Sequence, residues 1–341
     1  MRYLTVCGLV SVAGSLVWLA AVSDREPVFA GRRIPAPAPQ TLDPAAWGRD
    51  HVGRQLPEFM TGDECLFCHR MDVGPTWTRN RHYQTMRRAE PEAAAVAALR
   101  TLPSTKAAAE QVEFVLGSRR QVRFLKRGRK YGHLSLLSTA ASPTRQSGKF
   151  RLLHGEHPQW DSETFGKSCA GCHASGLDSQ TGAVAAVSLD CFTCHGEITL
   201  EHTRDSSKAL LAKRRRDPSR VVVSICGQCH LRTGTSRSNG RRFANNFVAG
   251  DNLFRDLRID WSDKHLDSLE PGDRHILQNI RDVVLLGRVQ TNCLSCHDVH
   301  KQSSTKHRKL TAAAICGNCH RPDGGRTVVN RRKQHNRVCE Y

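Results

Sequence analysis

Residues 169–195 read CAGCHASGLDSQTGAVAAVSLDCFTCH, and both ends of this stretch carry the pattern C-x-x-C-H. The pattern occurs six times in the 341 residues and uses twelve of the 14 cysteines. The copies, called here the first to sixth motifs, are CLFCH at 65–69, CAGCH at 169–173, CFTCH at 191–195, CGQCH at 226–230, CLSCH at 293–297 and CGNCH at 316–320. Six copies with one spacing indicate one repeated chemistry.

C-x-x-C-H is the attachment signal of c-type haem. The two thiols add across the two vinyl groups of the porphyrin, and the histidine that follows becomes the proximal ligand of the iron. We therefore predict six covalently attached haem c groups. The predicted attachment residues are Cys65, Cys68, Cys169, Cys172, Cys191, Cys194, Cys226, Cys229, Cys293, Cys296, Cys316 and Cys319. The predicted proximal ligands are His69, His173, His195, His230, His297 and His320.

Two other uses of the cysteines compete with haem attachment. Zinc sites also use C-x-x-C in pairs, but they do not require a histidine directly after every second cysteine. Disulfides are permitted in an exported protein, but they leave the histidines unexplained. Haem is the only one of the three that accounts for the whole pattern.

Histidines outside the motifs are candidates for the second axial ligand of each iron. His300 follows His297 by three residues, on the same side of that haem, so we expect it to bind a neighbouring haem. His82 and His202 follow the first and third motifs and are predicted as distal ligands in the same way. Further predicted distal ligands are His275, His157 and His133. Each could instead be a surface histidine, and Met60, Met71 and Met86 are alternative ligands near the first motif.

The composition agrees with an interior that is filled by cofactors. Hydrophobic residues make up 39% of the chain and aromatic residues 6%, which is low for side chains that must build the core alone. The formal net charge is +19, and haem propionates would offset much of it. We therefore expect no nucleic-acid partner.

The chain is predicted to divide into four parts. Residues 1–23 resemble a Sec-type signal peptide, although the apolar run 4–22 is also long enough for a retained membrane anchor. Residues 24–60 are a Pro-rich linker, 61–320 the hexahaem domain and 321–341 a basic tail. The expected location is periplasmic or otherwise extracytoplasmic.

The stretches TGDECLFCHRMDVGPTWTRNRH, SLDCFTCHGEITLEH and NCLSCHDVH resemble multihaem cytochromes of the cytochrome c-554 type over about residues 61–320. The resemblance implies that His82, His202 and His300 are distal ligands. The family commonly has Gly-Pro after CHG, whereas this chain has Glu197-Ile198. The family also often has a histidine shortly before the CLSCHD motif, and the segment 282–293 here has none.

These patterns predict a mainly α fold with long loops and a small β-hairpin at 112–137, organised by stacked covalent haems. The leading function is a periplasmic relay of electrons between a quinol oxidase or dehydrogenase and a terminal reductase. The alternative is an oxidoreductase that uses one five-coordinate haem on a small nitrogen or sulfur species. The ample histidines favour the carrier, and the missing histidine before Cys293 favours the enzyme. A subunit docked on a larger complex is compatible with the carrier.

Overall fold

The computed structural model describes residues 56–57, 61–90, 93–117, 120–146, 148–212, 217–284 and 292–301. All of them belong to one compact unit that begins at Thr41. The sixth motif, the predicted signal peptide, the basic tail and nearly all of the predicted linker lie outside these residues. Five of the six motifs can therefore be located.

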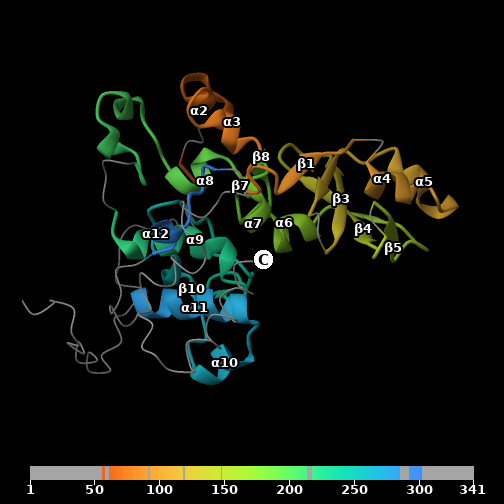
Figure 1. Ribbon diagram of the computed structural model, residues 1–341. Coiled ribbons are helices and arrows are strands. Elements are labelled where there is room, and N and C mark those ends of the chain that lie inside the picture. The colour runs from red at the N-terminus through yellow and green to blue at the C-terminus, as the bar shows by residue number, and fades with distance from the viewer. Residues whose placement is uncertain are drawn as a thin grey trace, which may run out of the picture. The chain divides into compact units, whose positions relative to one another are not determined.

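Residues 86–161 fold around one antiparallel sheet (Figure 1). Its strands are β1 (Met86–Arg88), β2 (Phe114–Leu116), β3 (Val122–Arg127), β4 (Leu134–Pro143), β5 (Phe150–Leu153) and β6 (Trp160–Asp161). The strand order is β1-β2-β3-β4-β5, and β6 also pairs with β4. The register slips once, between Arg123 and Leu125, where the β3–β4 pairing is irregular.

The sheet is buried on both faces. Along β2, Phe114 and Leu116 belong to one buried cluster, whereas Val115 belongs to another. The first cluster extends to the segment around the second motif. The second extends to helices α4 (Ala94–Leu99) and α5 (Pro103–Ala109), the two alanine-rich stretches of the sequence.

The prediction of a mainly α fold with one small β-hairpin is wrong. In the described part of the chain, 37% of the residues are helical and 19% are in strands, so the fold is mixed. The predicted hairpin is only the centre of a larger sheet. The long strand β4 explains the error, because a strand covered on both faces lacks the alternation that reveals strands in a sequence.

A second region carries most of the motifs. The hairpin of β7 (Ala174–Leu177) and β8 (Val184–Val187) occupies the chain between the second and third motifs. The other elements of the region are α2 (Gly62–His69), α3 (Gly74–Trp77), α6 (Thr164–Ser168), α7 (Ala170–His173), α8 (Cys191–His195), η2 (Leu200–Thr203), η3 (Ser206–Lys208), α9 (Ser219–His230), β9 (Thr235–Ser236), η4 (Leu253–Arg255), β10 (Leu257–Arg258), α10 (Asp263–Ser268), α11 (Pro271–Val284) and α12 (Cys293–Cys296).

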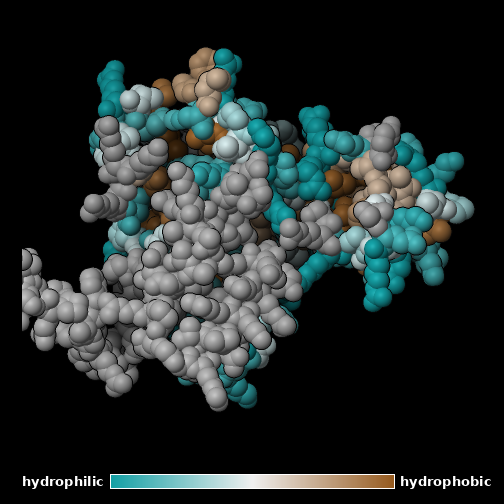
Figure 2. Space-filling model, in the orientation of Figure 1, coloured by the Kyte–Doolittle hydropathy of each residue, from teal (hydrophilic) through white to brown (hydrophobic). Residues whose placement is uncertain are grey.

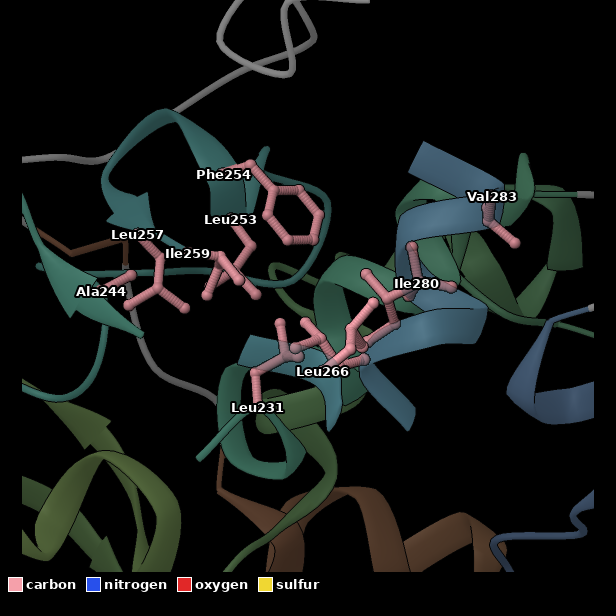
Figure 3. Close-up of a cluster of buried hydrophobic side chains, with 11 residues drawn as sticks. Leu231, Ala244, Leu253, Phe254, Leu257, Ile259, Leu266, Ile280 and Val283 are labelled. Carbon is pink, nitrogen blue, oxygen red and sulfur yellow. The ribbon is translucent and has the colours of Figure 1, made fainter. Parts of the chain in front are cut away.

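An apolar cluster fixes α9, the helix that ends in the fourth motif. Val223 of α9 packs with Leu277 and Ile280 of α11 and with Leu253 of η4, all fully or almost fully buried. Figure 3 shows this cluster, with Ile280 and Val283 on α11 and Leu253 and Phe254 on the neighbouring segment. Burying these side chains anchors the turn that carries Cys226 and Cys229. Within the described ranges, no helix is long and apolar enough to cross a membrane.

The face of the sheet that packs on α4 and α5 should be separable in energy from the motif region. Phe124 on β3 is fully buried in a cluster that contains no motif residue. Phe124→Ala should therefore lower the free energy of unfolding by about 3–5 kcal/mol, measured by urea denaturation with far-UV circular dichroism. Its haem absorption spectrum should match that of the wild type.

Tyr131→Ala is the matched control, because Tyr131 lies between β3 and β4 and is 97% exposed. It should change the unfolding free energy by less than about 0.5 kcal/mol. A haem spectrum altered by Phe124→Ala would show that this face of the sheet and the motif region are not separable.

Candidate haem-binding centre

Each described motif lies on a helix or a single helical turn. The first is on α2, the second on α7, the third on α8, the fourth at the end of α9 and the fifth on α12. Helix positions i and i+3 are neighbours on one face. The two cysteines of a motif can therefore reach one flat group, and the histidine follows on the next position.

Side-chain caps fix where three of these helices begin. Thr61 and Glu64 form a reciprocal capping box at the start of α2. Asn292 Oδ1 accepts a hydrogen bond from the Leu294 backbone N–H at 3.1 Å and so caps α12. At the start of α8, Asp190 Oδ1 accepts from the Phe192 N–H at 3.1 Å. These caps set the helical phase of the cysteines that follow them.

The described motif helices lie beside one another. Cysteine side chains of different motifs lie close together at three places: Cys65 by Cys191, Cys172 by Cys229, and Cys226 by Cys293. The first motif thus lies beside the third, the second beside the fourth, and the fourth beside the fifth. Gln228 Nε2 also donates to the Thr193 carbonyl at 3.2 Å, which joins the fourth motif to the third.

Asp190 links the first motif to the third. Its second carboxylate oxygen accepts a hydrogen bond from the Gly62 N–H of α2 at 3.3 Å. Burial raises the pKa of this carboxyl from 3.8 to about 6, and the hydrogen bonds from Gly62 and Phe192 oppose that rise. Nothing in the pattern C-x-x-C-H marks this residue, although it stands directly before the third motif.

Three motif histidines each face a histidine from outside the motifs. The ring centroids lie 6.3 Å apart in the pair His69–His202, 5.8 Å in His195–His300 and 6.2 Å in His82–His230. Two imidazoles bound to opposite faces of one iron have centroids about 6 Å apart, because each metal–nitrogen bond is about 2 Å long. The centroid spacing of all three pairs is therefore compatible with an iron between the rings, whose planes are 27°, 25° and 78° apart.

Hydrogen bonds at Nδ1 set the form of these imidazoles. His195 Nδ1 lies 2.6 Å from the Leu210 carbonyl, and His202 Nδ1 lies 2.7 Å from the Thr199 carbonyl. Because a carbonyl can only accept, Nδ1 carries the proton and Nε2 keeps its lone pair. That is the tautomer in which Nε2 can bind iron.

Burial also favours the neutral imidazole at two motifs. It lowers the pKa of both His173 and His195 below the usual 6.5. A histidine that binds a metal must be unprotonated. His173 differs from His195 in that its Nδ1 has no hydrogen-bond partner among the described residues.

The described motif residues are compatible with haem attachment. Where the structure describes the chain, no group of three or more His, Cys, Asp or Glu side chains could hold a metal ion by itself. The nine cysteines whose side chains are described are free thiols. Large apolar side chains stand exposed beside the His69–His202 pair, with Phe67 85% and Leu200 73% exposed. Figure 2 shows apolar surface over α2, which an apolar macrocycle could cover.

The remaining predicted distal ligands belong to other elements. His133 lies between β3 and β4, His157 is exposed between β5 and β6, and His275 is in α11. His297 caps the C-terminus of α12, and the sixth motif with His320 is outside the described residues. The ligand roles of these histidines stay predictions.

A loop with no recognisable sequence pattern lines the second motif. Phe243 lies so close to Gly171 that a Cβ at position 171 would overlap its ring, so only glycine fits there. A cavity beside them is lined by Gly171, Phe192, Thr193, Gln228, Phe243 and Ala249. It therefore borders the second, third and fourth motifs together.

Comparisons with known proteins bear on the motifs. The family model described as a doubled CXXCH motif matches residues 287–325, which hold the fifth and sixth motifs. This match supports a multihaem c-type cytochrome with covalently bound haem c. No curated protein matches the chain.

One solved structure is similar at a distance: an undecahaem cytochrome from the S-layer of Carboxydothermus ferrireducens. The identity is 16% and the TM-score 0.44. The similarity covers 80% of this chain but only 44% of that protein's chain.

The His69–His202 pair can be tested by removing one of the two imidazoles that would bind the iron. His202→Ala should remove the second imidazole facing His69, so the dithionite-reduced holoprotein should bind one more carbon monoxide than the wild type. The measurement is an optical titration. Glu201→Ala, an exposed neighbour in the same η2 turn, is the control and should bind no additional carbon monoxide. An unchanged titration for His202→Ala would rule out this pair.

Asp190 should impose a pH dependence on stability. Its native pKa of about 6 exceeds the ordinary 3.8, so the native state binds the proton more tightly. The resulting stabilisation is complete below pH 3.8 and is lost as the pH rises through 6. The unfolding free energy of the wild type minus that of Asp190→Asn should therefore fall by up to about 3 kcal/mol from pH 4 to pH 7. Urea denaturation of both holoproteins measures it, and a pH-independent difference would contradict the assignment.

Proposed function

We propose that this chain is an exported hexahaem cytochrome of the cytochrome c-554 type that relays electrons between redox partners. The observation that carries the proposal is the set of three histidine pairs, each joining one motif histidine to one histidine from outside the motifs. An iron with two protein ligands has no free position for a substrate, which suits a carrier better than a catalyst.

The chain's own residues have three tasks in this proposal. The cysteines of each motif bind the group covalently, and the motif histidine orients it from one face. His82, His202 and His300 bind from the other face and exclude small molecules from the iron. When bound, haem c supplies an iron that takes up and releases one electron at a time.

The contacts between motif helices support a continuous relay. The neighbouring cysteines and the Gln228 hydrogen bond place the first, third, fourth, second and fifth motifs in one connected group. Cofactors attached to adjacent helices are held close without relying on mobile loops. The ligands of the remaining irons are proposed to include His133, His157 and His275.

The proposed location is the periplasm or another extracytoplasmic space. It rests on the signal-like residues 1–23, with residues 4–22 as a possible anchor. The proposed partners are a quinol oxidase or dehydrogenase on one side and a terminal reductase on the other.

One observation favours a second candidate, an oxidoreductase with a five-coordinate iron. Among the described residues, no histidine ring faces His173, and a cavity lies beside its motif. An iron bound by His173 could then keep one free position. In that case the second motif would carry chemistry on a small molecule, and the other motifs would supply or remove its electrons.

The test uses the full chain, exported with haem-attachment machinery. Mass spectrometry and the pyridine haemochrome assay should give six haems, and the oxidised protein should show mainly low-spin iron by electron paramagnetic resonance. The reduced protein should bind no carbon monoxide if it is a carrier only. Binding of one equivalent, lost in His173→Ala, would favour the second candidate. A protein without covalent haem, or with mostly high-spin iron, would contradict both.

A further inference from the structure

Asn80 connects two histidines that belong to different pairs. It follows α3 in the loop before β1, and it is only 3% exposed. Its side-chain amide makes contacts in two directions, toward His82 and toward the backbone around His300. Those two histidines face His230 of the fourth motif and His195 of the third.

The amide oxygen of Asn80 accepts hydrogen bonds from His82. Asn80 Oδ1 lies 2.8 Å from the His82 backbone nitrogen and 3.1 Å from His82 Nδ1. An oxygen that accepts from Nδ1–H fixes the proton on that nitrogen and leaves Nε2 with its lone pair. The same oxygen accepts from the His82 backbone N–H, so Asn80 contributes to both the orientation and the tautomer of the ring.

On the other side, the amide nitrogen holds the segment that carries His300. Asn80 Nδ2 donates to the Val299 carbonyl at 2.7 Å and to the Lys301 carbonyl. These two carbonyls flank His300 in the chain. The His300 ring also meets the edge of Trp77, with centroids 6.3 Å apart, and the Trp77 carbonyl accepts from the Asn80 backbone N–H at 2.8 Å.

Only an amide satisfies both sides. The two N–H groups of His82 need an acceptor, and the carbonyls of Val299 and Lys301 need donors. This also fixes which end of the amide is oxygen, since the reverse orientation would oppose donor to donor and acceptor to acceptor. Both partner segments are distant in sequence from each other, so the contact is a tertiary link between them.

We propose that Asn80 is a positioning residue for two haem irons at once. It orients His82 toward the iron bound by His230, and it orients His300 toward the iron bound by His195. The inference rests on the proposed function, because it assumes that these four histidines bind iron. Asn80 itself touches neither iron.

The first test is Asn80→Ala in the full holoprotein. Losing both sets of contacts should release His82 and His300 from two irons and leave one coordination position free on each. The reduced variant should therefore bind two more equivalents of carbon monoxide than the wild type. The low-spin signals of the oxidised protein should decrease by two haems in electron paramagnetic resonance. His82→Ala and His300→Ala are single-iron references, and each should add one equivalent.

Gln84→Ala is the matched control. It removes another amide-to-carbonyl hydrogen bond of the same loop, from Gln84 Nε2 to the Thr78 carbonyl at 3.0 Å, which touches neither histidine. It should bind no additional carbon monoxide. A change in Asn80→Ala of zero or one equivalent, with six haems still attached, would overturn the inference.

Asn80→Asp separates the two sides and is close to the wild type in shape. At pH 8 its carboxylate still accepts from His82 but cannot donate to the Val299 and Lys301 carbonyls. It should therefore open one iron, and combining it with His300→Ala should add nothing further. An Asn80→Asp protein with both irons closed, or an additive double variant, would contradict the proposed division of roles.

Measuring covalent haem and low-spin iron in the wild type tells a failure of this inference from a failure of the proposed function. If the wild type lacks covalent haem or low-spin iron, the proposed function fails. If the wild type is a low-spin hexahaem protein and the Asn80 variants match it, only the role of Asn80 fails.

Discussion

The contact between motif helices is the constraint on which the rest of this structure depends. Five helical segments, as distant in the chain as 65–69 and 293–297, come together so that cysteines of different motifs lie close to one another. A turn carrying C-x-x-C-H offers two thiols and an imidazole on adjacent positions, but it has almost no apolar face of its own. Its position must therefore come from outside the motif. Asp190 and Asn292 supply it as caps, and the apolar cluster of α9 and α11 supplies it for the fourth motif.

The local chemistry of the site is readable from sequence because the thiols and the proximal histidine lie within five residues. The candidates His82, His202 and His300 also follow from short spacings to motifs, and the structure brings each of them beside a motif histidine. Which motif each one faces could not be predicted. His300 was expected only to serve a neighbouring haem, and its ring lies beside His195, more than one hundred residues earlier. Such a pairing is decided by the packing of helices, not by any spacing in the chain.

The extent of the sheet could not be predicted from the sequence, for a physical reason. The strands β2, β3 and β4 are covered by α4 and α5 on one face and by α6 and the β7–β8 hairpin on the other. β4 is therefore buried along most of its length, and only its start, together with β2 and β3 in the segment 112–137, alternates enough to predict a hairpin. The low apolar content suggested an interior built mainly from cofactors. The described part of the chain instead contains three clusters of buried side chains, so it has cores of its own beside the motifs.

The histidine rings differ in the groups that orient them: some are oriented by backbone carbonyls and one by a side chain. This difference determines how easily a substitution can change the orientation of a ring. His195 and His202 are oriented by the backbone carbonyls of Leu210 and Thr199, which survive almost any side-chain substitution. His82 is oriented by the side chain of Asn80, which also donates hydrogen bonds to the backbone carbonyls on both sides of His300. Two histidine pairs thus depend on one amide, and their motif histidines belong to the third and fourth motifs. These two motifs lie beside each other, and between them they adjoin the first, second and fifth motifs. A single substitution at position 80 would therefore act at the middle of the motif network, whereas most substitutions elsewhere would act on one motif at a time.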